Sequence, residues 1–533
     1  MQTLATLLFD SAARRPEAAA LIDERSAVNY GELETRVREF AAVLLQAGLT
    51  SQGRVAVFLE KSVESAALLL ATLHAGGIAV PVNPRLKPAQ VAFIVQNSGA
   101  ELLLTSAHRF AELAPALAAP GPGAVPRVIL TDRPAVPGTA ALPTLVQTLA
   151  QELPAARAAA PAPHRRIDSD AAAILYTSGS TGQPKGVVAS HRNLVAGCQA
   201  VNAYLGTRAD DAILALLPIS FDAGLSQLST GLAAGARVVL HTPLQAQRAA
   251  ALVAEHAITS ITAVPPMWAL LVAAHWEGLA TDSVRLIANT GGHMDAALLG
   301  RLRARFAKAR PFLMYGLTEA FRSTYLDPLE IDRRPGSIGK AIPNAEILVL
   351  RPDGTPCAAD EPGELVHRGA LVTLGYWNAP EKTAERFRPL PATLASGLAT
   401  ELAVWSGDVV RRDAEGFLYF VGRRDEMIKT SGYRISPTEI EVVLLAAPGV
   451  REAAVFGVPA GAAVGDAIYA TVVADAGGVD TAAVLARCAQ QLPAYMQPQL
   501  VVLTQLPRSA NGKLDRVALR HLCARLHAEG VAA

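Results

Sequence analysis

The middle of the chain alternates short apolar runs with stretches in which apolar residues recur at helical spacing. Residues 284–290, with apolar residues at 284 and 286–288, read as a strand. Leu298, Leu302 and Phe306 then follow at four-residue intervals, which places them on one face of a helix. Residues 312–315 form the next apolar run. This order of strand, helix and strand predicts a layered α/β domain.

Apolar patterning predicts further elements on both sides of this unit. Residues 171–175 read as a buried strand, and residues 452–458 read as another strand near the C-terminal end. Residues 66–82 are apolar but interrupted by His74, Gly76 and Gly77, which favours a core helix turning into a strand over a membrane span. Residues 115–165 are rich in Pro and Ala, with one apolar island at residues 128–130, and predict mostly surface connection.

An eleven-residue segment directly after the 171–175 run combines hydroxyls, glycines and one lysine. Glycines let backbone N–H groups close on an anion, and Lys185 adds a positive charge. The spacing differs from the P-loop of nucleotide hydrolases, because Gln183 and Pro184 separate Gly182 from Lys185. A polar surface linker is the alternative, although linkers rarely follow a buried strand so closely. The predicted phosphate-binding residues, for a ligand such as ATP, are Thr177, Ser178, Gly179, Ser180, Thr181, Gly182 and Lys185.

Length and composition fit an enzyme that acts on small molecules. A chain of 533 residues with 51% hydrophobic residues is long enough for more than one domain and for large cores. The net charge of +1 argues against nucleic acid or an anionic membrane surface as the main partner. The four cysteines are scattered, so neither a zinc site nor a disulfide framework is expected. No membrane span and no secretory signal are expected either, which favours a cytoplasmic location.

Several motifs in one order resemble those of the AMP-forming adenylating enzymes, which comprise acyl-CoA synthetases, adenylation domains of nonribosomal peptide synthetases, and luciferases. Residues 176–186 match the phosphate loop of this superfamily throughout. Residues 315–319 resemble its Tyr-Gly-x-Thr-Glu segment, and residues 406–408 its Thr/Ser-Gly-Asp motif. The later motifs are matched by residues 422–429, 432–435 and 511–513. The similarity spans nearly the whole chain.

The resemblance implies an α/β fold with a large multi-layer N-terminal domain of mixed sheets and a small mobile α+β C-terminal domain. We expect the AMP-binding domain over residues 1–424 and the small domain over residues 425–533, with the hinge at Asp425. Ser436, Pro437 and Glu439 form a capping box, which predicts that a helix starts there.

The resemblance also implies roles in the ATP site. Glu319 is expected to hold Mg²⁺ and Thr318 to bind the α-phosphate, although these two residues could instead begin a helix. Lys513 matches the catalytic lysine of the family, whereas taken alone its segment is a turn with a solvated cation. Asp408 and Arg423 are expected to contact the ribose, the alternatives being a turn aspartate and a surface ion pair. Further nucleotide-binding residues are expected at Gly292, Tyr315 and Gly316.

Asp222 is the best clue to the acid, because it lies in a mostly apolar segment where an ionised carboxylate needs a partner. In the peptide-synthetase branch a similar Phe-Asp binds the substrate ammonium, whereas an N-cap for a helix beginning at Ala223 explains Asp222 equally well. Phe221, Gly291 and His293 are the other expected pocket residues. Lys429 and Gly432 are expected to line the channel for the thiol.

The implied reaction has two stages. A carboxylate attacks MgATP to give an acyl-adenylate and pyrophosphate, and the thiol of CoA or phosphopantetheine then releases AMP. We therefore expect a stand-alone acid–thiol ligase of the acyl-CoA synthetase type, whose partners are a small carboxylic acid and either CoA or a separate acyl or peptidyl carrier protein. A carrier is expected to be separate because no carrier domain follows Lys513.

Three other hypotheses stay open at this point. The first is a stand-alone amino acid adenylating enzyme that loads a carrier protein. The second is a luciferase-like oxidoreductase, which nothing in the sequence favours. The third is a non-catalytic nucleotide-binding protein, against which the presence of Thr318, Glu319, Asp408 and Lys513 argues.

Overall fold

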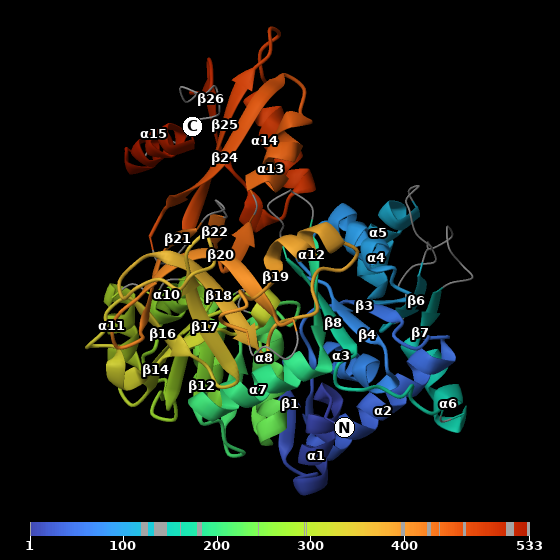
Figure 1. Cartoon of the computed structure of the whole chain (residues 1–533). Helices are drawn as coiled ribbons and strands as arrows, with labels where there is room; N and C mark the ends of the chain where they lie inside the picture. Colours follow the sequence, from blue (N-terminus) through green and yellow to red (C-terminus); the bar gives the residue numbers. More distant parts are fainter. Residues whose placement is uncertain are drawn as a thin grey trace.

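Figure 1 shows a large N-terminal body built around two sheets, with a small C-terminal domain above it. This mixed α/β architecture, with one large and one small domain, confirms the predicted fold class. The computed structural model describes residues 2–118, 126–132, 146–159, 161–177, 184–242, 245–292, 294, 296–395, 400–423, 428–435, 437–461, 465–507 and 516–529.

The first sheet of the large domain is mainly parallel. Its strands in the described part of the chain are β3 (Arg54–Phe58), β4 (Ile78–Pro81), β5 (Leu102–Thr105), β6 (Arg127–Leu130), β7 (Val146–Thr148), β8 (Ala171–Thr177) and β9 (Lys185–Ser190). They lie in the order β7-β6-β5-β3-β4-β8-β9, and β8 and β9 form an antiparallel pair. The apolar run predicted at residues 171–175 is thus a strand, and it ends at the carboxyl edge of the sheet.

The second sheet is longer and mixed. Its described strands are β1 (Ala19–Ile22), β2 (Ala27–Asn29), β10 (Ala212–Ala215), β11 (Arg237–Leu240), β12 (Ser260–Ala263), β13 (Leu286–Asn289), β14 (Arg310–Tyr315), β15 (Thr324–Leu326), β16 (Ser337–Ala341), β17 (Ala345–Leu350), β18 (Gly363–Gly369), β19 (Phe387–Pro389), β20 (Leu402–Arg412) and β21 (Leu418–Arg423). The order is β17-β18-β20-β21-β16-β15-β14-β13-β12-β10-β11-β1-β2, with β19 beside β20. The run from β11 to β14 is parallel, so the loops that follow these strands open at one edge, where α/β sheets bind ligands.

Helices pack between and around these sheets. The largest buried cluster joins α-helices to strands of both sheets, for example through Leu68, Leu104 and Val238. The helices and short 3₁₀ segments of the large domain are α1 (Leu4–Arg14), α2 (Tyr30–Gln46), α3 (Val63–Ala75), α4 (Pro88–Ser98), α5 (Ala107–Ala118), α6 (Leu149–Ala159), α7 (His191–Leu205), α8 (Asp222–Ala234), α9 (Ala246–Glu255), α10 (Pro265–Ala273), α11 (Ala296–Arg305), η1 (Thr318–Ala320), η2 (Pro328–Glu330) and α12 (Pro380–Arg386).

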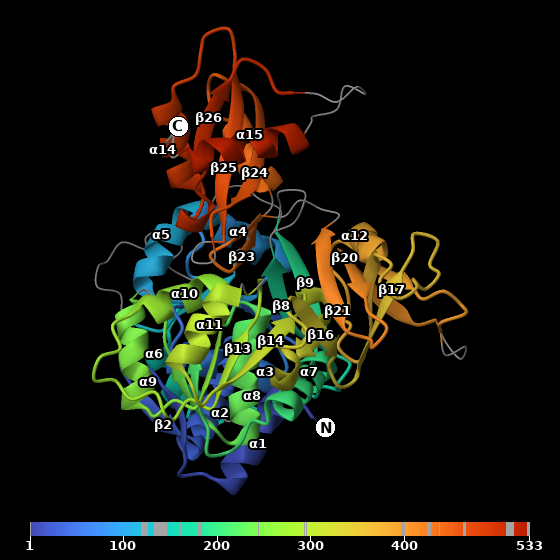
Figure 2. The same ribbon diagram turned by 90° about the vertical axis from the view of Figure 1, so that its left-hand side faces the viewer.

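The small domain has its own sheet and its own core. Its strands are β24 (Val450–Pro459), β25 (Asp466–Ala474) and β26 (Gln499–Leu503). Its helices and 3₁₀ segment are α13 (Pro437–Leu445), α14 (Thr481–Gln491), η3 (Ala494–Met496) and α15 (Arg516–Ala528). Ile440, Val472 and Val484 belong to its buried cluster. A hairpin of β22 (Ile428–Thr430) and β23 (Tyr433–Ile435) lies where the small domain meets the large one (Figure 2).

The strand-helix-strand unit predicted in the middle of the chain is confirmed as β13, α11 and β14, with Leu298 and Leu302 buried on one helix face. The predicted strand at residues 452–458 lies within β24, and the predicted helix begins at Pro437. The capping residue Ser436 lies outside the described residues, and the Glu439 carboxylate accepts a hydrogen bond from Gln90 at 3.2 Å.

The interpretation of residues 115–165 as mostly surface connection is wrong for the part that the structure describes. This stretch contains β6, β7 and α6, and the two strands extend the first sheet. Helix α6 is held by buried Leu149 and Ala156 and by an ion pair between Arg157 and Glu39 at 2.7 Å. Its proline, Pro154, sits inside the helix and made the segment look like a connection.

None of the helices within the described residues is both long and apolar enough to cross a membrane.

Candidate functional site

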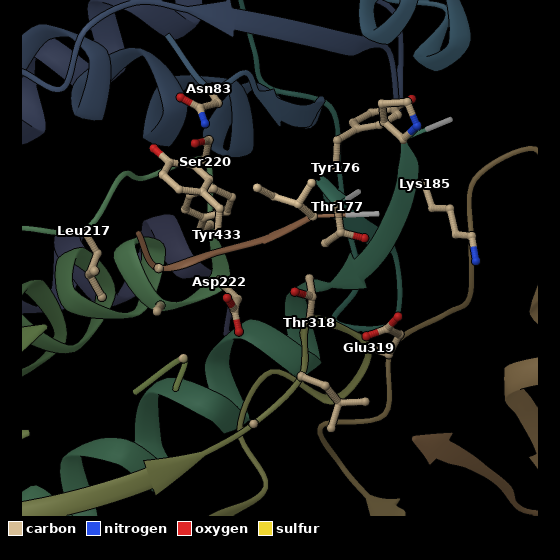
Figure 3. Close-up of a pocket in the computed structure, with 18 of the residues that line it drawn as sticks. Asn83, Tyr176, Thr177, Lys185, Leu217, Ser220, Asp222, Thr318, Glu319 and Tyr433 are labelled. Carbon is tan, nitrogen blue, oxygen red and sulfur yellow. The ribbon is translucent and has the colours of Figure 1, made fainter. Parts of the chain in front are cut away.

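A cavity of about 250 Å³ lies where loops from both sheets of the large domain meet the β22–β23 hairpin (Figure 3). Most of the described residues predicted for the site line it together, although they are distant in the sequence. These residues are Thr177, Lys185, Phe221, Asp222, Gly291, Tyr315, Gly316, Thr318, Glu319, Asp408, Lys429 and Gly432.

The remaining predicted residues fall into two groups. Gly292 is described but is not part of the cavity wall, and its carbonyl accepts a hydrogen bond from the Asn289 amide at 2.9 Å. Arg423 is described only as part of β21. The residues that lie outside the described part of the chain are Ser178, Gly179, Ser180, Thr181, Gly182, His293, Asp425 and Lys513.

One end of the cavity is formed by the β8–β9 pair. Thr177 at the end of β8 is directly opposite Lys185 at the start of β9, so the antiparallel pairing brings both ends of the predicted phosphate loop together. The Lys185 ammonium lies 5.3 Å from the centre of the Tyr376 ring. Burial lowers the pKa of Lys185, and the positive charges of Lys382 and Arg386 lower this pKa further. A polyphosphate bound here would offset that repulsion.

Glu319 is fixed by contacts to one short segment. The Tyr376 hydroxyl donates to the Glu319 carboxylate at 2.6 Å, and Thr373 donates to the Glu319 backbone carbonyl through its N–H and its hydroxyl. Among the described residues, no cluster of three His, Cys, Asp or Glu side chains could hold a metal ion. A Mg²⁺ ion at Glu319 would therefore take most of its ligands from phosphate oxygens and water, which is the usual arrangement for this ion.

Asp408 forms another end of the cavity. It is buried on β20, where its carboxylate accepts a hydrogen bond from the Tyr315 hydroxyl at 2.5 Å. Across the sheet Asp408 is paired in register with Arg423. The two residues predicted to contact the ribose are thus neighbours on adjacent strands. Tyr315, which was predicted only as a nucleotide-binding residue, also orients the Asp408 carboxylate.

Asp222 lines the part of the cavity opposite the β8–β9 pair and is the first residue of α8 (Figure 3). The N-cap position is occupied by Phe221, whose side chain makes no capping hydrogen bond. The helix thus begins one residue earlier than the capping alternative placed it, while the Asp222 carboxyl still accepts hydrogen bonds from backbone N–H groups at Ala223 and at Asp222 itself. Burial raises the pKa of the Asp222 carboxyl, while the charge of buried Arg322 acts in the opposite direction.

The β22–β23 hairpin closes the cavity from the side of the small domain. Gly432 has φ +78°, and a β-carbon there would come within 2.6 Å of the Val264 side chain. The Tyr433 ring meets the Phe221 ring edge-on, with centroids 5.4 Å apart, and stacks on Tyr495 at 3.6 Å. Tyr433 of the hairpin thus contacts Phe221 of the large domain on one side and Tyr495 of the small domain on the other.

A second cavity of about 350 Å³ adjoins the first. The two share Pro81, Asn83, Ser220 and Tyr433 as wall residues. Ser431 lines the second cavity and Gly432 the first, so the turn of the hairpin lies between them.

Sequence reasoning missed several residues of this site, among them Tyr376, Arg386 and Arg322. Tyr376 contacts Glu319 from a position 57 residues away in the sequence, so no local pattern indicates the contact. The sequence signal at this point is a glycine followed by two aromatic residues, Gly375, Tyr376 and Trp377. In the structure Gly375 has φ +115°, a backbone conformation that favours glycine.

Comparison with known proteins gives the same assignment along most of the chain. The family model described as AMP-binding enzyme matches residues 8–377. The model described as AMP-binding enzyme C-terminal domain matches residues 439–513.

Individual relatives are similar over nearly their whole length. The L-proline–[L-prolyl-carrier protein] ligase of Pseudomonas fluorescens is 33% identical over 97% of this chain and 99% of its own. The sulfoacetate–CoA ligase of Cupriavidus necator is 33% identical over 97% of both chains. The solved o-succinylbenzoate CoA synthetase of Bacillus subtilis covers 98% of both chains with a TM-score of 0.79 and 27% identity. The chain therefore belongs to the AMP-binding enzyme family, the superfamily of AMP-forming adenylating enzymes.

Proposed function

We propose that this protein activates a carboxylic acid with MgATP and then transfers the acyl group to the thiol of a pantetheine arm. The observation that supports this most strongly is one cavity whose walls combine Lys185 and Glu319, Asp408, Asp222 and the β22–β23 hairpin. Lys185 and Glu319 suit a triphosphate with its Mg²⁺, and Asp408 suits a ribose. Asp222 suits the substrate acid, and the hairpin suits the thiol.

In the first half-reaction an oxygen of the substrate carboxylate attacks the α-phosphorus, and the bond to the β-phosphate breaks to release pyrophosphate. Lys185 and Arg386 are the described cations that would offset charge on the phosphates, and Thr318 would donate to the α-phosphate. Mg²⁺ held at Glu319 would neutralise charge on the phosphate oxygens. Asp408, oriented by Tyr315, would accept hydrogen bonds from the ribose hydroxyls.

In the second half-reaction the thiol sulfur attacks the acyl carbonyl, the bond to the phosphate oxygen breaks, and AMP leaves. The thiol proton passes to solvent or to the leaving phosphate. The second cavity would admit the pantetheine arm, and Gly432, with Lys429 beside it, would leave the passage open at its inner end. The hairpin in the cleft suits this step. For the first step we propose that the small domain, residues 425–533, turns about Asp425 and brings Lys513 to the α-phosphate.

The acceptor is either CoA or a separate carrier protein, and relatives of both kinds exist. An amino acid as the acid is favoured by the Asp222 carboxylate, which faces the cavity and forms no ion pair with the described residues. A buried carboxylate that forms no ion pair suits a ligand that brings an ammonium.

Acid-dependent exchange of pyrophosphate into ATP tests the first half-reaction with a panel of fatty, aromatic and amino acids. We expect exchange with one class of acid, and thioester formation with CoA or with a phosphopantetheinylated carrier. Folded protein that binds ATP but supports no exchange with any acid would reject the proposal in favour of a nucleotide-binding protein.

A further inference from the structure

Arg322 is a buried cation in the wall of the cavity near Asp222. Its side chain is 3% exposed, and one guanidinium nitrogen donates to the Thr290 hydroxyl at 3.0 Å. Its Nε has no hydrogen-bond partner among the described residues. A guanidinium that is removed from water needs acceptors for its N–H groups, so this side chain has unused donor capacity.

The backbone before Arg322 is held in an unfavourable conformation. Phe321 has φ +56°, in the left-handed region that residues with a β-carbon rarely adopt. Its ring is buried against Gly197, where a β-carbon would come within 2.6 Å of the ring. This packing fixes the turn that directs Arg322 into the cavity.

Asp222 brings a charge of the opposite sign to the same cavity. The two side chains form no ion pair in the described structure, yet the Arg322 charge is the largest influence that lowers the pKa of Asp222. Burial outweighs it, and the pKa stays raised. The Ser220 hydroxyl, also buried in this wall, has no hydrogen-bond partner among the described residues. The acid end thus contains an anion and a cation that form no ion pair among the described residues, together with an unpartnered Arg322 Nε and Ser220 hydroxyl. The Asp222 carboxyl also accepts backbone hydrogen bonds, and Arg322 also hydrogen-bonds to Tyr204.

We call the part of the substrate other than the adenylated carboxylate its tail. The charges on this tail decide which acids suit the part of the cavity that contains Asp222 and Arg322. An uncharged tail offers no counter-ion to Asp222 or to Arg322. An ammonium alone pairs with Asp222 but is repelled by Arg322, and a second carboxylate alone pairs with Arg322 but is repelled by Asp222. A tail with both an ammonium and an anion satisfies both groups and leaves no net charge buried.

We propose that the substrate is an amino-dicarboxylic acid, of which one carboxylate is adenylated, the ammonium binds Asp222 and the second carboxylate binds Arg322. This inference rests on the proposed function, because it names the acid of the same reaction. The competing possibility is that Asp222 and Arg322 only compensate each other across the cavity and contact no charged group of the substrate.

The test begins with the wild-type protein and needs no substitution. Pyrophosphate exchange is measured with aspartate, glutamate and 2-aminoadipate, with asparagine and glutamine as neutral isosteres, with succinate and glutarate as acids lacking the ammonium, and with fatty, aromatic and neutral amino acids. We expect kcat/KM for the best amino-dicarboxylic acid to exceed that of its amide and of its amine-free analogue by about 100-fold, as for loss of one buried charge pair. An acid of another class within about tenfold of the best one overturns the inference but leaves the proposed function intact. Absence of exchange with every acid overturns both.

Two variants then assign the charges. Arg322→Gln should lower kcat/KM for the amino-dicarboxylic acid by about 100-fold and change that for its amide by less than about threefold. Asp222→Asn should likewise lower kcat/KM for the amino-dicarboxylic acid by about 100-fold. It should change kcat/KM for the diacid that lacks the ammonium by less than about threefold. Arg322→Lys keeps the charge and should retain the preference for the dicarboxylic acid. An equal loss for every acid in Arg322→Gln, with ATP binding retained, would indicate that Arg322 is only structural and would overturn the inference.

Discussion

Replacement of Tyr376 by phenylalanine removes one hydroxyl that holds the Glu319 carboxylate. The hydroxyl donates to Glu319 at 2.6 Å. The rest of the ring stays, so its contact with the Lys185 ammonium and its edge-on packing against Phe387 at 5.6 Å are kept. Tyr376→Phe therefore tests the orientation of the carboxylate that is proposed to hold Mg²⁺, together with the contact of the same hydroxyl to Arg386.

The size of the effect follows from the kind of hydrogen bond. A hydrogen bond to a charged group contributes about 1.5–3 kcal/mol. If Glu319 must be held in place for MgATP to react, the loss appears in the rate, where this energy corresponds to about 10- to 100-fold. The Mg²⁺ concentration needed for half-maximal rate should rise as well, because a carboxylate that can rotate binds the ion less well.

Acid-dependent pyrophosphate exchange, followed as a function of Mg²⁺ concentration, measures both quantities. Tyr419→Phe is the matched control, since it removes a hydroxyl that donates to the Asp413 carboxylate at 3.2 Å outside the cavity wall. This control should keep the wild-type profile. If Tyr376→Phe stays within about twofold of wild type in rate and Mg²⁺ requirement while Glu319→Gln is inactive, the proposed orientation of Glu319 by Tyr376 is wrong.

Three further predictions concern the small domain. Gly432→Leu should slow thioester formation more than pyrophosphate exchange, because a side chain there meets Val264 and its φ is positive; similar losses in both assays would contradict this. With the hairpin in the cleft, burial raises the pKa of Glu439 from 4.5 to about 7. This arrangement of the two domains is therefore favoured at low pH and loses stability as pH rises from about 4.5 to about 7. Energy transfer between dyes on the two domains should show this change, and Glu439→Gln should reduce it. Lys513→Ala should abolish acid-dependent exchange but leave AMP binding, measured by calorimetry, within about twofold.

The elements that could be predicted from the sequence are those with a local signal. The strand at residues 171–175 and the unit of β13, α11 and β14 have apolar runs or a clear helical period, and the structure has them close to the predicted bounds. Helix α6 has a weaker pattern, with only Leu149 and Ala156 buried and a proline inside. It is a helix because α2 offers a surface for it to pack on, which no local pattern indicates.

The same distinction applies to the site. The phosphate loop and the segment at residues 315–319 are compact motifs, so their residues could be proposed from spacing and resemblance. Tyr376 contacts Glu319 across the fold, and Arg322 lines the same cavity as Asp222; only the structure brings the members of each pair together. The sequence does not decide the role of Asp222, because a carboxylate at the start of a helix can accept backbone hydrogen bonds and face a ligand at the same time.

Charge at the phosphate end gives a physical reason for the order of the two half-reactions. Burial lowers the pKa of Lys185, the positive charges of Lys382 and Arg386 lower it further, and a bound triphosphate would offset this unfavourable charge. Release of pyrophosphate removes most of that negative charge, whereas Asp408 and the acid end still hold the adenylate. In the proposed mechanism, the small domain first lies with Lys513 at the α-phosphate. The attraction between the phosphates and the cations that favours this position weakens once pyrophosphate has left. The hairpin with Lys429 and Gly432 can then occupy the cleft, where the contact of its Tyr433 ring with Phe221 stabilises the arrangement proposed for the thiol step.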